Sequence, residues 1–154
     1  MLSSLRDFIP GASHWPSFLK NESAQFEARL TMVEVESSNS ILLQGLEGSK
    51  APIIVSHGEG RTSYEKAQVS GINSCLRYVD NYGKVATSYP ANPNGSEAGI
   101  AGVCSDDGRV TIMMPHPERG FLNRQLSWRS TRTTEPESIW MEIFHNAKQW
   151  SQQS

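Results

Sequence analysis

The stretch Val110-Thr-Ile-Met-Met-Pro-His-Pro-Glu-Arg119 decides how the rest of this sequence is interpreted. Its first five residues, 110–114, are nearly all apolar and predict an interior strand that is covered on both faces. Pro115 and Pro117 each fix their own φ and push the preceding residue toward extended geometry. His116 is therefore predicted to lie in a stiff turn just beyond the C-terminal end of a strand, where open α/β sheets usually bind ligands.

The same stretch places a carboxylate close to the histidine. Side chains at positions i and i+2 of an extended segment point to the same side, so Glu118 can hold one imidazole nitrogen of His116. The other nitrogen then stays free, which is the base and orienter half of a nucleophile triad. By itself the His-x-Glu triplet is more typical of an ordinary surface turn. The two flanking prolines and the apolar strand before them give the two interpretations equal weight.

Composition excludes several classes of protein. The chain has 154 residues, enough for one domain with a core, and 14 basic against 16 acidic residues give a net charge of -2. This balance argues against a nucleic-acid or anionic-membrane partner. No apolar run approaches the ~20 residues of a membrane span, and the first residues lack a signal peptide's pattern. Two cysteines form no disulfide framework, which favours a reducing, cytoplasmic location.

Hydrophobic patterns predict an α/β domain with several strands and few helices. Residues 26–35 predict a strand with either a bulge or a change of exposure. Residues 100–105 and 110–114 predict a hairpin around Asp106-Asp-Gly108. Further strands are predicted at residues 51–55 and 76–79, with a short strand or buried turn at 41–43 and a short helix at 63–69.

The two ends of the chain both predict helices. Apolar residues at helical spacing mark residues 135–150 as an amphipathic helix, with Thr134 and Glu137 as a capping box. Residues 1–8 resemble the tail of a helix that ends at Pro10-Gly11. A domain rarely starts in the middle of a helix, so we expect that something upstream is missing.

Two loop motifs contain candidate ligand-binding residues. In Ser56-His-Gly-Glu-Gly-Arg61, which follows a strand, the glycines permit close approach of a ligand to the backbone, but they also suit a plain tight turn. Asn92-Pro-Asn-Gly95 could present amides to a substrate or partner, although a surface turn is the simpler interpretation.

The sequence offers neither a convincing thiol nucleophile nor a metal site. Cys104 lies in an apolar strand and is expected to be a buried core thiol, and Cys75 has no basic or glycine-rich surroundings. His14 and His145 have no partner at ligand spacing, so no metal site is expected.

Several segments, in order, resemble one family. They are Phe26-Glu-Ala-Arg29, Ile53-Ile-Val-Ser-His-Gly-Glu-Gly-Arg61, Leu76-Arg-Tyr-Val-Asp80, Tyr89-Pro-Ala-Asn-Pro-Asn-Gly-Ser96 and the opening stretch 110–119. Together they are similar to the C-terminal glutaminase domain of phosphoribosylformylglycinamidine synthase in its large single-chain form. The resemblance covers nearly the whole chain and implies an incomplete flavodoxin-like class I glutamine amidotransferase sandwich with a mixed sheet, a single partial glutaminase domain over residues 1–154.

The resemblance implies roles for individual residues. His116 would be the general base and Glu118 its orienter, while His57 and Gly58 would help shape the glutamine pocket. The family's nucleophile is a cysteine on a glycine-rich elbow, and neither cysteine of this chain matches it. Met1 would then follow the missing cysteine by two or three residues, and the isolated chain is expected to be inactive.

The resemblance also implies partners and a setting. Glutamine would be the substrate, and the ammonia would pass to a synthetase domain of the same polypeptide, an ATP-dependent carbon–nitrogen ligase of purine biosynthesis. This chain itself would bind no cofactor, since ATP and Mg²⁺ belong to that synthetase portion. Two alternatives remain open: a non-catalytic amidotransferase-like module that docks on a synthetase partner, and a metal-dependent hydrolase using His57, His116 and carboxylates.

Overall fold

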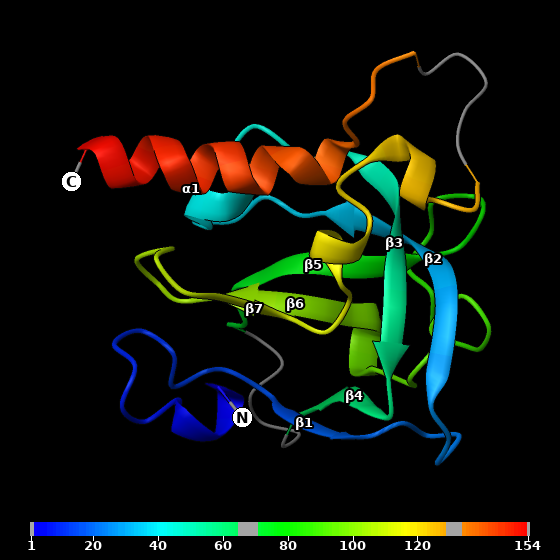
Figure 1. Ribbon diagram of the computed structural model, residues 1–154. Helices are drawn as coiled ribbons and strands as arrows, with labels where there is room; N and C mark the ends of the chain where they lie inside the picture. The colour runs from blue at the N-terminus through cyan, green and yellow to red at the C-terminus, as the bar shows by residue number, and fades with distance from the viewer. Residues whose placement is uncertain (1, 65–70, 129–133, 154) are drawn as a thin grey trace.

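A computed structural model describes residues 2–64, 71–128 and 134–153 of the chain. In these ranges the strands form two antiparallel sheets, and the helix α1 (Glu142–Gln153) runs across one end of the larger sheet (Figure 1). The strands are β1 (Ser17–Lys20), β2 (Glu27–Val35), β3 (Lys50–His57), β4 (Glu59–Ser63), β5 (Ser74–Val79), β6 (Ile100–Cys104) and β7 (Thr111–Met113). Short 3₁₀ helices occupy Leu2–Leu5, Ile41–Leu43, Glu97–Gly99, Pro117–Arg119, Asn123–Gln125 and Ile139–Met141.

The larger sheet has the strand order β3-β2-β5-β6-β7, and β1 pairs with β4 beside it. The expected α/β class is confirmed, but every strand pair in the described ranges is antiparallel rather than part of a mixed sheet. Antiparallel neighbours need only short connections, whereas parallel strands need long crossovers that are usually helical. The described connections between strands contain short 3₁₀ turns and no α-helix.

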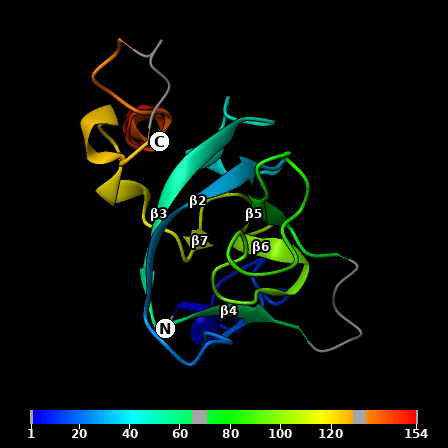
Figure 2. The ribbon, with the colours of Figure 1, turned by 90° about the vertical axis from the view of Figure 1, so that its right-hand side faces the viewer.

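The larger sheet curls until its two edges approach each other (Figure 2). The chain leaves β7 through Met114 and Pro115, and His116 then forms an antiparallel bridge with Ile54 of β3. The backbone N–H of His116 donates to the carbonyl of Ile54 at 2.7 Å. Because β3 and β7 are the two outer strands, this bridge connects opposite edges of the sheet and places His116 at their junction.

Strand β2 settles the alternatives left open for residues 26–35. Its register with β3 runs unbroken from Glu27 opposite His57 to Glu34 opposite Lys50, so there is no bulge in this pairing. Thr31, Val33 and Val35 are buried, whereas the residues between them are half-buried. The apparent change of phase in the sequence is therefore a change of exposure, because both faces of this strand carry apolar side chains.

Strand β7 is shorter and more exposed than the predicted interior strand. The expected hairpin is confirmed, since β6 and β7 pair from Gly102–Met113 to Cys104–Thr111. However, β7 is an edge strand, with Ile112 buried and the residues on either side half-buried. The prediction of an interior strand is wrong for the described residues because the apolar run borders a surface groove.

Two clusters of buried side chains form the core. The first lies between the curled sheet and the C-terminal helical segment, and the indole of Trp140 donates to the carbonyl of Pro52 at 2.7 Å. The second joins the N-terminal segment to β6 and β7 around Trp15, whose indole donates to the carbonyl of Cys104 at 3.1 Å. Both tryptophans are fully buried, so each secures a peripheral segment to the sheet.

The C-terminal helix begins later than its sequence pattern predicts. The helix α1 starts at Glu142 after a 3₁₀ turn, and Ser138, rather than Thr134, caps that turn by accepting a hydrogen bond from the N–H of Trp140. Residues 135–137 are used elsewhere, since Glu137 forms a bridge with Leu122. Pairing with a distant segment thus overrides the local helix signal.

The other two helices predicted from the sequence, at residues 1–8 and 63–69, also differ from the structure where it describes them. Of residues 1–8, only Leu2–Leu5 form a 3₁₀ helix among the described residues. In the predicted helix at 63–69, Ser63 ends strand β4 and residues 65–69 lie outside the described residues.

Replacing Trp140 by alanine should lower the free energy of unfolding by about 3–5 kcal/mol, because it removes a fully buried indole and leaves a cavity. Urea denaturation of the purified chain followed by circular dichroism measures this change. The matched control is Gln152→Ala, an exposed position on α1. Equal stability of the two variants would contradict the assigned packing.

Candidate functional site

His116 and Glu118 form a hydrogen-bonded pair at the junction of the sheet edges. The Nδ1 atom of His116 lies 2.7 Å from Oε1 of Glu118. The side chains are 27% and 52% exposed, so the pair is open to solvent or to a partner. Glu118 lies in the 3₁₀ turn Pro117–Arg119 rather than in an extended segment, yet its carboxylate still reaches the ring.

This geometry leaves Nε2 of His116 available. No other described residue bonds to that nitrogen, and Arg119 approaches the far side of the pair, with its Nε 3.7 Å from Oε1 of Glu118. A carboxylate on Nδ1 favours the tautomer whose Nε2 accepts a proton. The pair can therefore act as a base that takes a proton and later returns it.

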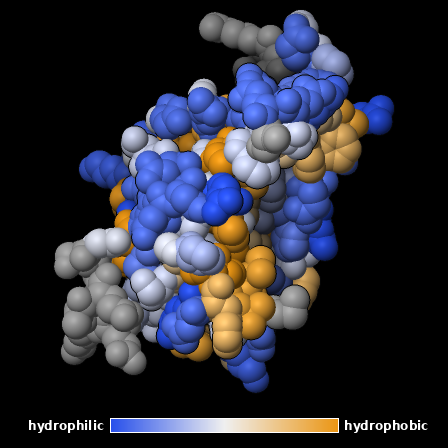
Figure 3. Space-filling model, turned by 90° about the vertical axis from the view of Figure 1, so that its left-hand side faces the viewer, coloured by the Kyte–Doolittle hydropathy of each residue, from blue (hydrophilic) through white to orange (hydrophobic). Residues whose placement is uncertain are grey.

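His116 and Glu118 border a groove of about 740 Å³. Its walls come from β7, the N-terminal segment and one face of α1, and apolar residues gather on this side of the molecule (Figure 3). The apolar lining residues are Leu2, Phe18, Leu42, Ile112, Met113, Met114, Pro115, Pro117, Ile143, Phe144 and Ala147. The polar ones are Ser3, Glu59, Thr111, His116 and Glu118.

His57 and Gly58 do not line this groove, but their neighbour Glu59 does. The His57 side chain points into the protein, is 7% exposed, and has no hydrogen-bond partner for either ring nitrogen among the described residues. Burial and the nearby charge of His116 lower the pKa of His57. His57 is therefore a neutral ring behind the site, and its contact with glutamine stays a prediction.

Gly60 allows this arrangement because it packs on the His57 ring. A Cβ atom at Gly60 would lie 2.3 Å from Cε1 of His57, well inside contact distance. A Cβ at Gly58 would meet only the ring of Phe26 at 4.0 Å. The two glycines of the motif thus have different roles, and only Gly60 is required by close packing.

The Asn92-Pro-Asn-Gly-Ser96 segment is buried rather than a surface turn, and a contact of its amides with a substrate or partner stays a prediction. Asn92, Asn94 and Ser96 are all buried. The amide of Asn94 donates to the carbonyl of Gly60 at 2.8 Å, and Oγ of Ser96 accepts from the N–H of Thr62 at 3.1 Å. The segment therefore supports β4, the strand that begins with Glu59, because buried backbone groups need partners.

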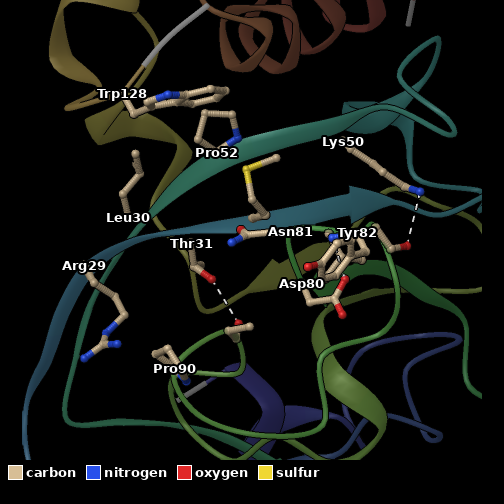
Figure 4. Close-up of a pocket in the computed structure, with 14 residues that line it drawn as sticks. Arg29, Leu30, Thr31, Lys50, Pro52, Asp80, Asn81, Tyr82, Pro90 and Trp128 are labelled. Atoms are coloured by element: carbon tan, nitrogen blue, oxygen red, sulfur yellow. Dashed lines mark hydrogen bonds between the residues drawn. The ribbon is translucent and has the colours of Figure 1, made fainter.

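A second, larger cavity of about 1000 Å³ lies on the outer face of β2 and β3 (Figure 4). Leu30, Pro52 and Trp128 line it, and Arg29 sits at its edge with its guanidinium 4.4 Å from the ring centroid of Tyr89. None of the described residues that line it is a histidine or cysteine. We therefore place the chemistry in the smaller groove.

The structure brings together two cysteines that are far apart in the sequence. Cys75 and Cys104 are free, fully buried, and close to each other on the neighbouring strands β5 and β6. His14 lies next to them, but its Nε2 contacts the carbonyl of Cys104 at 3.2 Å. Neither thiol lines the groove, which agrees with the prediction that neither is the nucleophile.

The described residues contain no group of three or more histidine, cysteine, aspartate or glutamate side chains placed to hold a metal ion. No helix in the described ranges has the length and apolar character needed to cross a membrane.

Replacing Gly60 by alanine should lower the free energy of unfolding by about 1–3 kcal/mol, because the new methyl group forces the His57 ring to move. Gly58→Ala is the control two residues away, and we expect little change in its stability. Thermal denaturation compares the two variants. A Gly58 variant less stable than the Gly60 variant would contradict the packing described above.

The lowered pKa of His57 predicts a stability loss in mild acid. The unfolded chain binds the proton near the ordinary pKa of 6.5, whereas the folded chain binds it only at lower pH. The contribution of neutral His57 to the free energy of unfolding is therefore fully present above pH 6.5, and it is lost as the pH falls below that value. When the pH is lowered from about 7.5 to about 5, the urea midpoint of unfolding should fall less for His57→Gln than for the unmodified chain. Equal falls, or a His57 ring that titrates above 6.5 by NMR, would contradict this prediction.

Comparison with known proteins gives the site its context. The structure is similar to one described as the structure of PurLQS from Thermotoga maritima, with a TM-score of 0.64 and 26% sequence identity. The match covers 88% of this chain and 53% of that one, so this chain spans about half the length of its structural relative. The family model for the CobB/CobQ-like glutamine amidotransferase domain matches residues 1–151. This chain therefore belongs to the CobB/CobQ-like glutamine amidotransferase family.

Proposed function

We propose that this chain is the C-terminal part of the glutaminase domain of a phosphoribosylformylglycinamidine synthase, and that it supplies the base and orienter for glutamine hydrolysis. The observation that carries the proposal is the 2.7 Å contact between Nδ1 of His116 and Glu118, which leaves Nε2 free beside the groove. Membership of the amidotransferase family and the likeness to PurLQS support it.

The nucleophile in this proposal is a cysteine contributed from outside this chain. Cys75 and Cys104 are fully buried away from the groove, so a separate segment must deliver the thiolate. Strand β7 offers an edge for such a segment, because its pairing in the described ranges is with β6 alone. Apolar walls on both sides of this edge would be covered by the incoming segment.

The proposed reaction has two halves. His116 takes the proton of the cysteine thiol at Nε2, and the resulting thiolate attacks the side-chain amide carbon of glutamine. The protonated His116 then returns that proton to the departing nitrogen, so that ammonia leaves and a glutamyl thioester remains. His116 then takes a proton from water, the hydroxide attacks the thioester, and glutamate and the thiolate are released. Throughout, Glu118 holds the ring and stabilises its protonated form.

The released ammonia would serve a synthetase site outside this chain. We propose that this partner is a domain of the same polypeptide, where ATP and Mg²⁺ support amidination of formylglycinamide ribonucleotide in purine biosynthesis. The cytoplasmic location expected from the cysteine content stays a prediction. No described residue of this chain needs to bind a cofactor in this scheme.

The decisive test compares the isolated chain with the longer polypeptide that carries it. The isolated 154-residue chain should release no glutamate from L-glutamine, because it lacks the nucleophile. The complete polypeptide should release glutamate, and His116→Asn should reduce kcat by at least about a hundredfold, the usual contribution of a general acid–base group. Glu118→Gln should also reduce kcat.

The matched control is His145→Asn, an exposed histidine on α1 that does not line the groove. It should keep the unmodified rate. His116-dependent glutamate release by the isolated chain would overturn the requirement for an external cysteine. A complete polypeptide that folds but hydrolyses no glutamine would favour a binding module instead.

A further inference from the structure

We propose that Glu59 binds the α-ammonium group of glutamine and so selects for the free amino acid. This inference rests on the proposed function, because it assumes that the groove beside His116 receives glutamine. The inference starts from the charges of the groove. Among the described residues that line it there is no lysine or arginine, and Glu59 and Glu118 are the two carboxylates.

Glu59 carries the carboxylate that remains available in the groove. Glu118 is already bonded to Nδ1 of His116, and the hydroxyl of Thr111 is bonded to that of Ser40 at 2.7 Å. The carboxylate of Glu59 has no hydrogen bond or ion pair with any described residue. Lys20 lies opposite Glu59 in the pairing of β1 with β4, yet the two side chains form no ion pair.

The backbone that carries Glu59 is held from both sides. On one side, Asn21 donates from its side chain to the carbonyl of His57 at 2.7 Å and from its backbone to that of Gly58 at 3.0 Å. On the other, the buried amide of Asn94 donates to the carbonyl of Gly60 at 2.8 Å. The residues before and after Glu59 are therefore each held by a buried asparagine, while the side chain of Glu59 is exposed.

This arrangement is preorganised for a charged ligand. Gly60 and the His57 ring face the interior, and Glu59, the preceding residue of the strand, faces the groove because adjacent residues of a strand point to opposite sides. A rigid support lowers the entropy lost when a ligand is bound. The Glu59 side chain is exposed, so an incoming ammonium group can reach its carboxylate.

Glutamine has two ends with different chemistry. Its amide must meet the nucleophile and His116, and its other end carries an ammonium and a carboxylate. The unpaired carboxylate of Glu59, which lines the same groove as His116, offers an acceptor for the ammonium group of a bound glutamine. Glu59 would then act as a specificity residue that recognises the substrate without taking part in the chemistry.

The test uses the complete polypeptide and two substrates, L-glutamine and glutaramate, which is glutamine without its α-amino group. Glu59→Gln should raise KM for L-glutamine by about tenfold or more, the effect of one charge-assisted hydrogen bond, with kcat nearly unchanged. KM for glutaramate should stay the same, because that substrate lacks the ammonium. Glu59→Asp keeps the charge and should fall between the two proteins.

The matched control is Glu47→Gln, which neutralises an exposed carboxylate away from the groove and should alter neither KM. Equal effects of Glu59→Gln on both substrates, or no effect on either, would overturn the inference while His116-dependent hydrolysis still supports the proposed function. Absence of glutaminase activity in the unmodified polypeptide would instead overturn the proposed function. If Glu59→Gln does not fold, Glu59→Asp with both substrates decides: an unchanged preference between them overturns the inference.

Discussion

The hydrogen bond from the backbone N–H of His116 to the carbonyl of Ile54 is the constraint on which the site depends. Pro115 and Pro117 have no N–H group, so His116 holds the one backbone donor of this tripeptide. That donor is used to join the end of β7 to the edge of β3. The position of the imidazole is therefore set by the main chain, which leaves the ring free for Glu118 and for chemistry.

A second set of constraints acts from inside the curled sheet. Asparagine side chains provide the hydrogen bonds that neighbouring strands do not provide around residues 57–60. Asn92 contributes in the same way, because its amide donates to the carbonyls of Ala86 and Ser96. A buried carbonyl without a donor is costly, so replacing these amides would disturb the loop even though none of them reaches the groove.

The open groove and the His116–Glu118 pair suit the proposed hydrolysis of glutamine. Thioester chemistry needs a base close to the nucleophile and protection of the intermediate from bulk water. The groove beside His116 has extensive apolar walls and borders the edge strand β7, so a segment docked there would both bring a nucleophile and exclude solvent. The larger cavity near Trp128 has a comparable apolar surface, but no histidine base is among the described residues that line it. An apolar cavity alone is therefore not sufficient for the proposed reaction.

The sequence by itself determined the features that depend on neighbours along the chain. The β6–β7 hairpin follows from two apolar runs around an Asp-Asp-Gly turn, and the His116–Glu118 pair follows from a histidine held between two prolines with a glutamate two residues further on. The family resemblance also came from short local motifs. Each of these signals is contained within about fifteen residues, so no knowledge of distant contacts was required.

The tertiary structure alone decided which residues face the groove and which are buried. It made β7 an edge strand, placed Asn94 inside the protein, brought Cys75 beside Cys104, and exposed Glu59 rather than His57. It also shortened α1, because Glu137 pairs with Leu122. The physical reason is the same in each case: burial and pairing depend on segments that are distant in sequence, and local periodicity carries no information about which of those segments arrives.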